Sequence, residues 1–160
     1  MSGVTPAELG QHAFLRGMTE HHLAVLSRAC WVAPWRAGHR LFEEGGTAQR
    51  CWLLQSGQVA LDLHSPGERG LIVETLGPGD LVGLSWFVPP YQWQFGATAV
   101  QDTVTFELNA IAVRAACEED PALGYALLRR VMAAASSRLH ATRVRLLDLY
   151  GGAGGGQEQP

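Results

Sequence analysis

The feature that most constrains the fold is a stretch of short alternating segments between Gly38 and Leu61. Residues 38–45 read Gly-His-Arg-Leu-Phe-Glu-Glu-Gly, and residues 52–61 read Trp-Leu-Leu-Gln-Ser-Gly-Gln-Val-Ala-Leu. Glycines occupy the expected turns, and apolar residues alternate with polar ones between them. This pattern is typical of short antiparallel strands that bury one face.

The same rhythm extends from Trp31 to about Leu108. Turn signals recur at Gly45-Gly46, Ser56-Gly57, Ser65-Pro66-Gly67 and Gly77-Pro78-Gly79. Strands at this spacing predict a closed or sandwiched β-structure, and we expect a jelly-roll-like barrel, or β-roll, over residues 31–108. A chain of 160 residues with 47% hydrophobic content can bury one sizeable core, so a single domain is predicted over residues 1–150.

Helical patterns flank these strands and make the predicted fold class α+β, mainly β. Before the strands, one pattern spans about Ala7–Leu15 and a second opens at Thr19. After them, Asn109 is the expected N-cap of a short helix that ends near Cys117. Asp120, followed by Pro121, is the expected cap of a longer one.

The last predicted helix covers residues 121–149 and is roughly 40 Å long at 1.5 Å per residue. Seven of its residues recur at alternating steps of four and three: Leu128, Met132, Ala135, Leu139, Thr142, Leu146 and Leu149. This heptad spacing favours a parallel homodimer seam, and the alternative is that the stripe packs on the strands of its own chain. Residues 151–160 are predicted to form a flexible glycine-rich tail.

The arrangement of Phe42, Gly45, Trp52, Leu54, Gly57 and Val59 resembles the β-roll of cyclic-nucleotide-binding domains. These are the sensory modules of catabolite-activator-type regulators (the CRP/FNR-like proteins). The resemblance covers residues 14–149, and it places Gly79-Asp80-Leu81-Val82-Gly83 at the family's phosphate-binding cassette. It implies binding of a cyclic nucleotide such as cAMP or cGMP. The helix-turn-helix domain that follows in those regulators has no counterpart before residue 160, so we expect a stand-alone sensor.

This cassette departs from the family pattern at both charged positions. The resemblance implies a Glu where Leu84 stands and an Arg within Trp93-Gln94-Phe95, and neither is present. No Lys or Arg occurs between Arg69 and Arg114. Two lost charge-assisted bonds, worth about 1.5–3 kcal/mol each, would weaken an ordinary cyclic mononucleotide by roughly two to four orders of magnitude. Either another part of the protein supplies the charge, or the ligand is different. The resemblance implies that Arg138, Arg143 and Arg145 reach across a dimer to the mouth of the roll, where family members place a base-capping contact.

Aromatic residues replace the missing charges, because residues 84–95 contain five aromatics and two consecutive prolines. Aromatic faces stack on planar bases, so a purine cyclic nucleotide, a cyclic dinucleotide or another flat metabolite would suit the segment. The alternative is that Trp86, Trp93 and Phe95 fill a cavity that binds nothing. The predicted ligand-binding residues are Gly79, Gly83, Leu84, Ser85, Trp86, Tyr91, Trp93, Gln94, Phe95, Arg138 and Thr142.

Other chemistries find little support. The six histidines form no His-x-His pair, which argues against a cupin-like metal enzyme, and no nucleophile motif is present, so we expect neither a catalytic set nor a metal. Three widely spaced cysteines are expected to be buried thiols. A net charge of -3 argues against DNA binding by this chain. Without a spanning segment or signal peptide, a cytoplasmic protein is expected.

The functional prediction is a homodimeric, non-enzymatic sensor that binds a nucleotide ligand and no further cofactor. Ligand at the cassette would change how the roll sits against the long helix, and this would carry a signal to an unknown protein partner. The alternative is a protein-interaction module with a degenerate pocket that binds no nucleotide.

Overall fold

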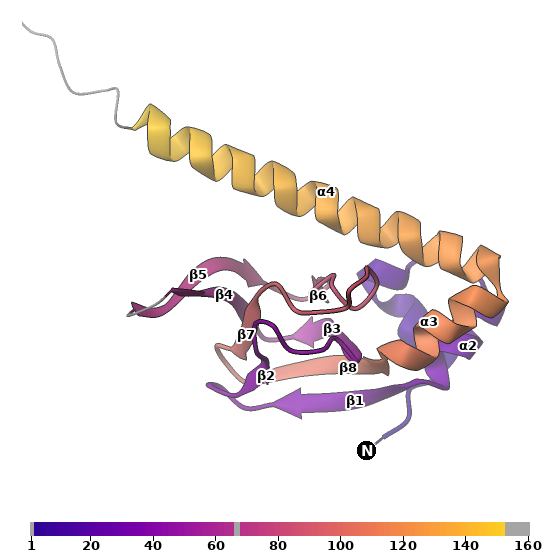
Figure 1. Cartoon of the computed structure of the whole chain (residues 1–160). Coiled ribbons are helices and arrows are strands. Elements are labelled where there is room, and N and C mark those ends of the chain that lie inside the picture. Colours follow the sequence, from indigo (N-terminus) through magenta and orange to yellow (C-terminus); the bar gives the residue numbers. More distant parts are fainter. Residues whose placement is uncertain (1, 66–67, 153–160) are drawn as a thin grey trace, which may run out of the picture.

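The computed structural model describes residues 2–65 and 68–152 of the chain. Figure 1 shows the strands gathered beneath one long helix, α4, with the shorter helices at the end where α4 begins. The helices are α1 (Pro6–Gln11), the 3-10 helix η1 (Ala13–Leu15), α2 (Glu20–Ser27), α3 (Ala110–Glu119) and α4 (Pro121–Gly151). The strands are β1 (Cys30–Trp35), β2 (Arg40–Phe42), β3 (Arg50–Ser56), β4 (Val59–Ser65), β5 (Glu68–Leu76), β6 (Leu81–Val82), β7 (Gly96–Ala99) and β8 (Thr103–Asn109).

The strands form two antiparallel sheets of four strands each, in the orders β1-β8-β3-β6 and β2-β7-β4-β5. The chain crosses repeatedly from one sheet to the other, so both sheets contain strands from its whole length. This arrangement confirms the predicted mainly-β roll with flanking helices. Strands β6 and β5 each end their sheet at an edge, where backbone groups lack a strand partner on one side.

The helical pattern predicted over Ala7–Leu15 is divided in the structure, and His12 is the reason. His12 has an extended backbone (φ -68°, ψ 134°) that ends α1, and its Nδ1 accepts the N–H of Phe14 to cap η1. Its Nε2 lies 2.8 Å from the carbonyl oxygen of Leu54 on β3. A long-range contact therefore interrupts what local propensity alone would continue.

The caps predicted for the last two helices are confirmed. The side chain of Asn109 accepts the N–H of Ala112 at the start of α3, and the side chain of Asp120 accepts that of Ala122 at the start of α4. The helix α4 buries only Leu123, Leu127 and Val131, all within its first eleven residues. Although α4 continues to Gly151, none of its residues after Val131 is buried. Most of the tail predicted at 151–160 lies outside the described residues.

The core of the β1-β8-β3-β6 sheet contains a buried carboxylate, Glu107. It accepts hydrogen bonds from the indole N–H groups of Trp31 and Trp52, the latter at 2.8 Å. A guanidinium nitrogen of Arg50 lies 3.5 Å from an oxygen of the same carboxylate. These partners offset the free-energy cost of burying a charged carboxylate. Nearby, burial and the charge of Glu107 raise the pKa of Cys30 to about 12.

The expectation of buried thiols holds for Cys30 and Cys51, whereas Cys117 is half-buried. All three are free. No helix among the described residues is long and apolar enough to cross a membrane.

Candidate ligand-binding site

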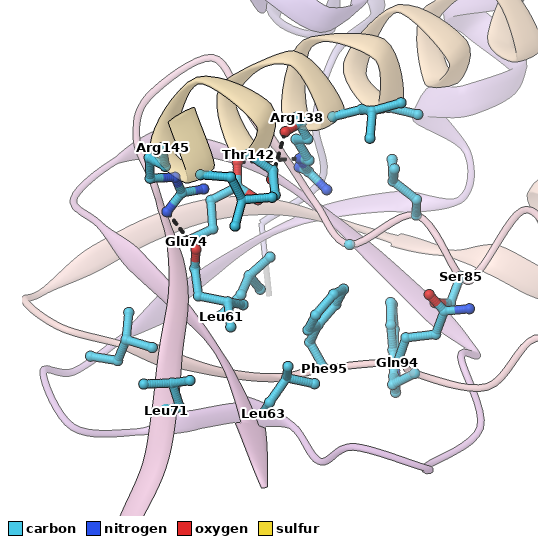
Figure 2. A pocket seen from close by; sticks show the side chains of 18 of the residues that line it. Leu61, Leu63, Leu71, Glu74, Ser85, Gln94, Phe95, Arg138, Thr142 and Arg145 are labelled. Atoms are coloured by element: carbon cyan, nitrogen blue, oxygen red, sulfur yellow. Dashed lines mark hydrogen bonds and ion pairs between the residues drawn. The ribbon is translucent and has the colours of Figure 1, made fainter. Parts of the chain in front are cut away.

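A cavity of about 780 Å³ lies between the β2-β7-β4-β5 sheet and the second half of α4 (Figure 2). Its lining comes from three regions: strands β2, β4 and β5, the segment that follows β6, and α4. The lining residues are Phe42, Leu61, Leu63, Leu71, Ile72, Val73, Glu74, Gly83, Leu84, Ser85, Trp93, Gln94, Phe95, Ala135, Arg138, Leu139, Thr142, Arg145, Leu146 and Leu149. A volume of this size lies within the range of small-molecule pockets.

The structure brings most of the predicted site residues together on this cavity. Those that line it are Gly83, Leu84, Ser85, Trp93, Gln94, Phe95, Arg138 and Thr142. We call Leu84, Ser85, Trp93, Gln94 and Phe95 the floor. Three of the predicted residues, Gly79, Trp86 and Tyr91, do not line it.

The turn around Gly79 is occupied by contacts within the chain. The N–H of Gly79 donates to the carbonyl oxygen of Leu54 at 2.8 Å, and that of Gly77 donates to the carboxylate of Asp80 at 2.8 Å. Asp80 in turn donates its N–H to the carbonyl oxygen of Gly77. The expectation that this turn offers its amides to a ligand phosphate is therefore not met, because the protein already uses them.

Free amides lie a few residues further on instead. Within the part of the chain that the structure describes, the N–H groups of Leu84, Ser85 and Trp86 donate to no protein acceptor. Leu84 and Ser85 accept hydrogen bonds through their carbonyl oxygens, from Phe87 and Val88 respectively, so the segment forms a short turn beside the cavity. Consecutive free N–H groups suit an anion or a carbonyl oxygen.

The aromatic residues of the predicted site have different roles. Trp93 stacks on Phe42, with ring centroids 3.8 Å apart, and it is buried apart from the surface it shows to the cavity. Its ring lies against Gly83, where an added Cβ would come within 2.5 Å of the indole. Phe95 is half-buried and stands in the cavity (Figure 2). Of the two, Phe95 is the ring available for stacking.

Trp86 and Tyr91 belong to the support of the floor. Trp86 is 2% exposed, and its indole N–H has no partner among the described residues. Its carbonyl oxygen accepts from Arg114, whose guanidinium also lies 4.0 Å from the centroid of the Tyr91 ring. Trp86 and Trp93 both belong to the hydrophobic core, as the alternative expected, and a cavity nevertheless remains.

Charged groups reach the cavity from the side of α4. We call Arg138, Thr142 and Arg145 the roof; Figure 2 shows them opposite Phe95 and Gln94. Arg138 donates to the carbonyl oxygen of Leu81, and Arg145 donates to that of Val73 at 2.6 Å. Both hydrogen bonds are made to the β-roll of the same chain. The contact across a dimer that the sequence led us to expect of these arginines stays a prediction.

Glu74 on β5 is a candidate site residue that sequence reasoning missed. Its carboxylate lies 3.9 Å from Nε of Arg138, and the side chains of Arg138 and Glu74 are 17% and 23% exposed. Burial lowers the pKa of Arg138, while the charges of Glu74 and Asp80 oppose that shift. The available signal was the acidic residue at position 74 within the apolar run of β5, but only the fold places it beside an arginine 64 residues later in the chain.

No arrangement for metal chemistry is present in the described ranges, where no group of three His, Cys, Asp or Glu side chains could hold an ion. His12 is buried, and Nε2 of His22 lies 3.2 Å from a carboxylate oxygen of Asp120.

Comparisons with known proteins agree with this geometry. The family model described as "Cyclic nucleotide-binding domain" matches residues 32–120, more than half of the chain. The CRP-like cAMP-activated global transcriptional regulator of Mycobacterium tuberculosis (strain ATCC 25618 / H37Rv) is 24% identical over 141 residues, or 88% of this chain. The chain spans only 61% of the length of that relative.

Two solved structures share the fold. A candidate cyclic nucleotide-binding protein from Geobacter metallireducens GS-15 is 27% identical, with a TM-score of 0.78 over 86% of this chain and 99% of the other. The N-terminal domain of a transcriptional regulator from Streptomyces coelicolor A3(2) is 24% identical, with a TM-score of 0.63 over 87% of this chain and 94% of the other.

Proposed function

Because the chain belongs to the cyclic nucleotide-binding domain family, we propose that it is a ligand-sensing regulatory protein whose ligand is a cyclic nucleotide or a related planar nucleotide. The observation that carries this proposal is the 780 Å³ cavity, lined jointly by the cassette segment and by α4. A ligand placed there would touch both the rigid roll and the helix that leaves it.

The floor supports binding of a flat, polar-edged ring. Phe95 offers an aromatic face, and base–aromatic stacking is worth about 1–3 kcal/mol in single-stranded nucleic acid complexes. Ser85, Gln94 and the free amides of residues 84–86 offer hydrogen bonds at the edge of such a ring. Most other lining residues are apolar, as in typical ligand pockets.

Signalling would pass through α4 and a homodimer. An apolar stripe on this helix is exposed in the single chain, including Leu128, Met132 (57% exposed) and Leu139. Isolated helices gain much of their stability from packing, so a second copy of α4 is the expected cover. A ligand that binds one dimer arrangement more tightly would shift the population toward it and alter the surface offered to a partner protein.

A second candidate function is a protein-interaction module without a nucleotide. It is favoured by the exposed aliphatic residues Leu71 (62%) and Ile72 (60%) at the cavity mouth, on the edge strand β5. Exposed apolar groups beside an edge strand are typical of peptide-binding surfaces. Under this reading no nucleotide would stabilise the protein.

The test is a titration of thermal stability against cAMP, cGMP and cyclic dinucleotides, together with native mass spectrometry of protein purified from its own host. We expect at least one nucleotide to raise Tm, and Phe95→Ala to abolish that shift. Val88→Ala is the matched control, because Val88 is exposed on the same segment and outside the cavity. Trp93→Ala is a poorer probe since it would remove core packing as well. Apoprotein throughout, with no shift for any nucleotide, would favour the second candidate.

A further inference from the structure

The cavity has an uneven distribution of charge. Its floor contains no ionisable side chain, because residues 84, 85 and 93–95 are Leu, Ser, Trp, Gln and Phe. Its two cationic side chains, Arg138 and Arg145, both come from α4. The one acidic lining residue, Glu74, lies beside Arg138. A ligand with one anionic group and one flat uncharged end therefore finds its two partners on opposite sides.

The same two arginines hold α4 to the roll. Arg138 donates to the carbonyl oxygen of Leu81 on β6, and Arg145 donates to that of Val73 on β5. Strands β6 and β5 are the edges of the two different sheets. The arginines are seven residues apart, or about 10 Å along the helix axis. Together they form a strap between the second half of α4 and both sheet edges.

This strap matters because that half of α4 has little else to hold it, as none of its residues after Val131 is buried. Both arginines contact neutral carbonyl acceptors. A guanidinium bonds an anionic oxygen more strongly than a neutral carbonyl oxygen because the two opposite charges attract, and it pairs with phosphate through two parallel bonds. An anion within reach of either arginine would compete with the carbonyl that it now contacts.

We propose that Arg138 and Arg145 bind the anionic group of the ligand, and that ligand binding exchanges their contacts with the edges of β5 and β6 for contacts with that anion. The ligand class is a planar nucleotide whose phosphate faces α4 and whose base lies on Phe95. This inference rests on the proposed function. Glu74, freed from Arg138, is placed to accept a hydrogen bond from a ligand hydroxyl group.

Under this proposal, Arg145 attracts the anionic group of the ligand more strongly than Arg138 does. It has no carboxylate within ion-pair distance among the described residues, whereas Glu74 partly neutralises Arg138. The remaining arginines of α4 are placed differently: Arg129 lies over Tyr125, Arg130 donates to the carbonyl oxygen of Arg16, and Arg143 is exposed outside the cavity lining. Arg143→Gln therefore separates this proposal, under which binding is unchanged, from the expectation from the sequence that Arg143 reaches the site across a dimer.

The experiment measures binding of cAMP and cyclic di-GMP by calorimetry to the wild-type chain and to Arg145→Gln, Arg138→Gln and Arg143→Gln. We expect the nucleotide that binds the wild type to bind Arg145→Gln at least about tenfold more weakly, or about 1.4 kcal/mol, and Arg143→Gln unchanged. If Arg138→Gln fails to fold, Arg145→Gln still tests the proposal, because the side chain of Arg145 is exposed. The uncharged nucleoside of the same base should bind the wild type and Arg145→Gln equally.

Hydrogen exchange over residues 132–151 tests the strap itself. We expect Arg145→Gln to raise exchange there without ligand, and the binding nucleotide to change exchange in the wild type. Binding that is equal in all variants, or that leaves this exchange unaltered, would overturn the inference while the proposed function stands. If no nucleotide binds the wild type, the proposed function fails and this inference fails with it.

Discussion

The two ends of the roll differ in how completely they are filled. Where α4 begins, Leu123, Leu127 and Val131 are buried in the hydrophobic core, which also contains residues of both sheets. Where α4 ends, the same helix spans a cavity over the β2-β7-β4-β5 sheet and buries no residue. One continuous helix thus joins a solid end to a hollow end. The difference indicates that stability belongs to the first end and ligand response to the second.

The sharpest way to break this comparison is to truncate a leucine at each end of α4. Leu123 is fully buried, so Leu123→Ala should lower the free energy of unfolding by about 2–5 kcal/mol through lost burial and a residual cavity. Leu147 is 72% exposed, and Leu147→Ala should stay within about 0.5 kcal/mol. Denaturant unfolding measures both. Similar losses for the two variants would show that the far end of α4 is packed as firmly as the near end.

A charge in the exposed stripe tests whether a second copy covers the hollow end. Met132→Glu should raise the dimer dissociation constant about 100-fold, or about 2.7 kcal/mol, because the interface would then bury a carboxylate. Met132 does not line the 780 Å³ cavity, so the ligand contacts are spared. Sedimentation velocity is the measurement, and His140→Glu on another face of the helix is the control. Dimers that persist in Met132→Glu would refute the seam.

The floor of the cavity is predicted to be rigid, and two glycines test this. Gly83 has φ +79°, and a Cβ there would lie 2.5 Å from the ring of Trp93. Gly38 has φ +88° with open space around it, so Gly38→Ala carries only the backbone strain, about 1 kcal/mol. Gly83→Ala should cost about 1–3 kcal/mol more, since Trp93 is stacked on Phe42 and cannot shift freely. Equal unfolding free energies for the two variants would mean that Trp93 moves to make room for the added methyl group.

Local signals predicted much of the fold. The caps at Thr19, Asn109 and Asp120 and the strand rhythm between the turns depend on neighbours within a few residues, and the structure has all of them. The division of the first helix at His12 was not predictable, because it depends on a bond to Leu54, 42 residues away.

The site was predicted less completely, for the same reason. The sequence identified residues 84–95 as an aromatic segment. It could not show that Trp86 lies in the core and that Phe95 faces a cavity. It could identify the Gly79 turn, but not that Leu54 and Asp80 use its amides. The heptad stripe was predicted as a seam, yet five of its seven residues line the cavity of their own chain: Ala135, Leu139, Thr142, Leu146 and Leu149. The spacing alone could not show that these positions face the roll.

The smallest expected effect is the dependence of stability on pH that arises from the buried imidazole of His12. Burial lowers the pKa of His12 from its ordinary value of 6.5, although the bond to Leu54 and the charge of Asp80 oppose the shift. Below pH 6.5 the unfolded chain therefore binds a proton that the folded chain resists. The stability linked to His12 is fully present above that pH and is lost as the pH falls toward the lowered value, by at most about 1.4 kcal/mol per pH unit. His12→Gln should flatten the fall in unfolding free energy between pH 7 and pH 5, whereas His140→Gln, on the exposed half of α4, should leave it unchanged. An identical slope in His12→Gln would show that the buried imidazole takes up its proton without loss of its contacts to η1 and β3.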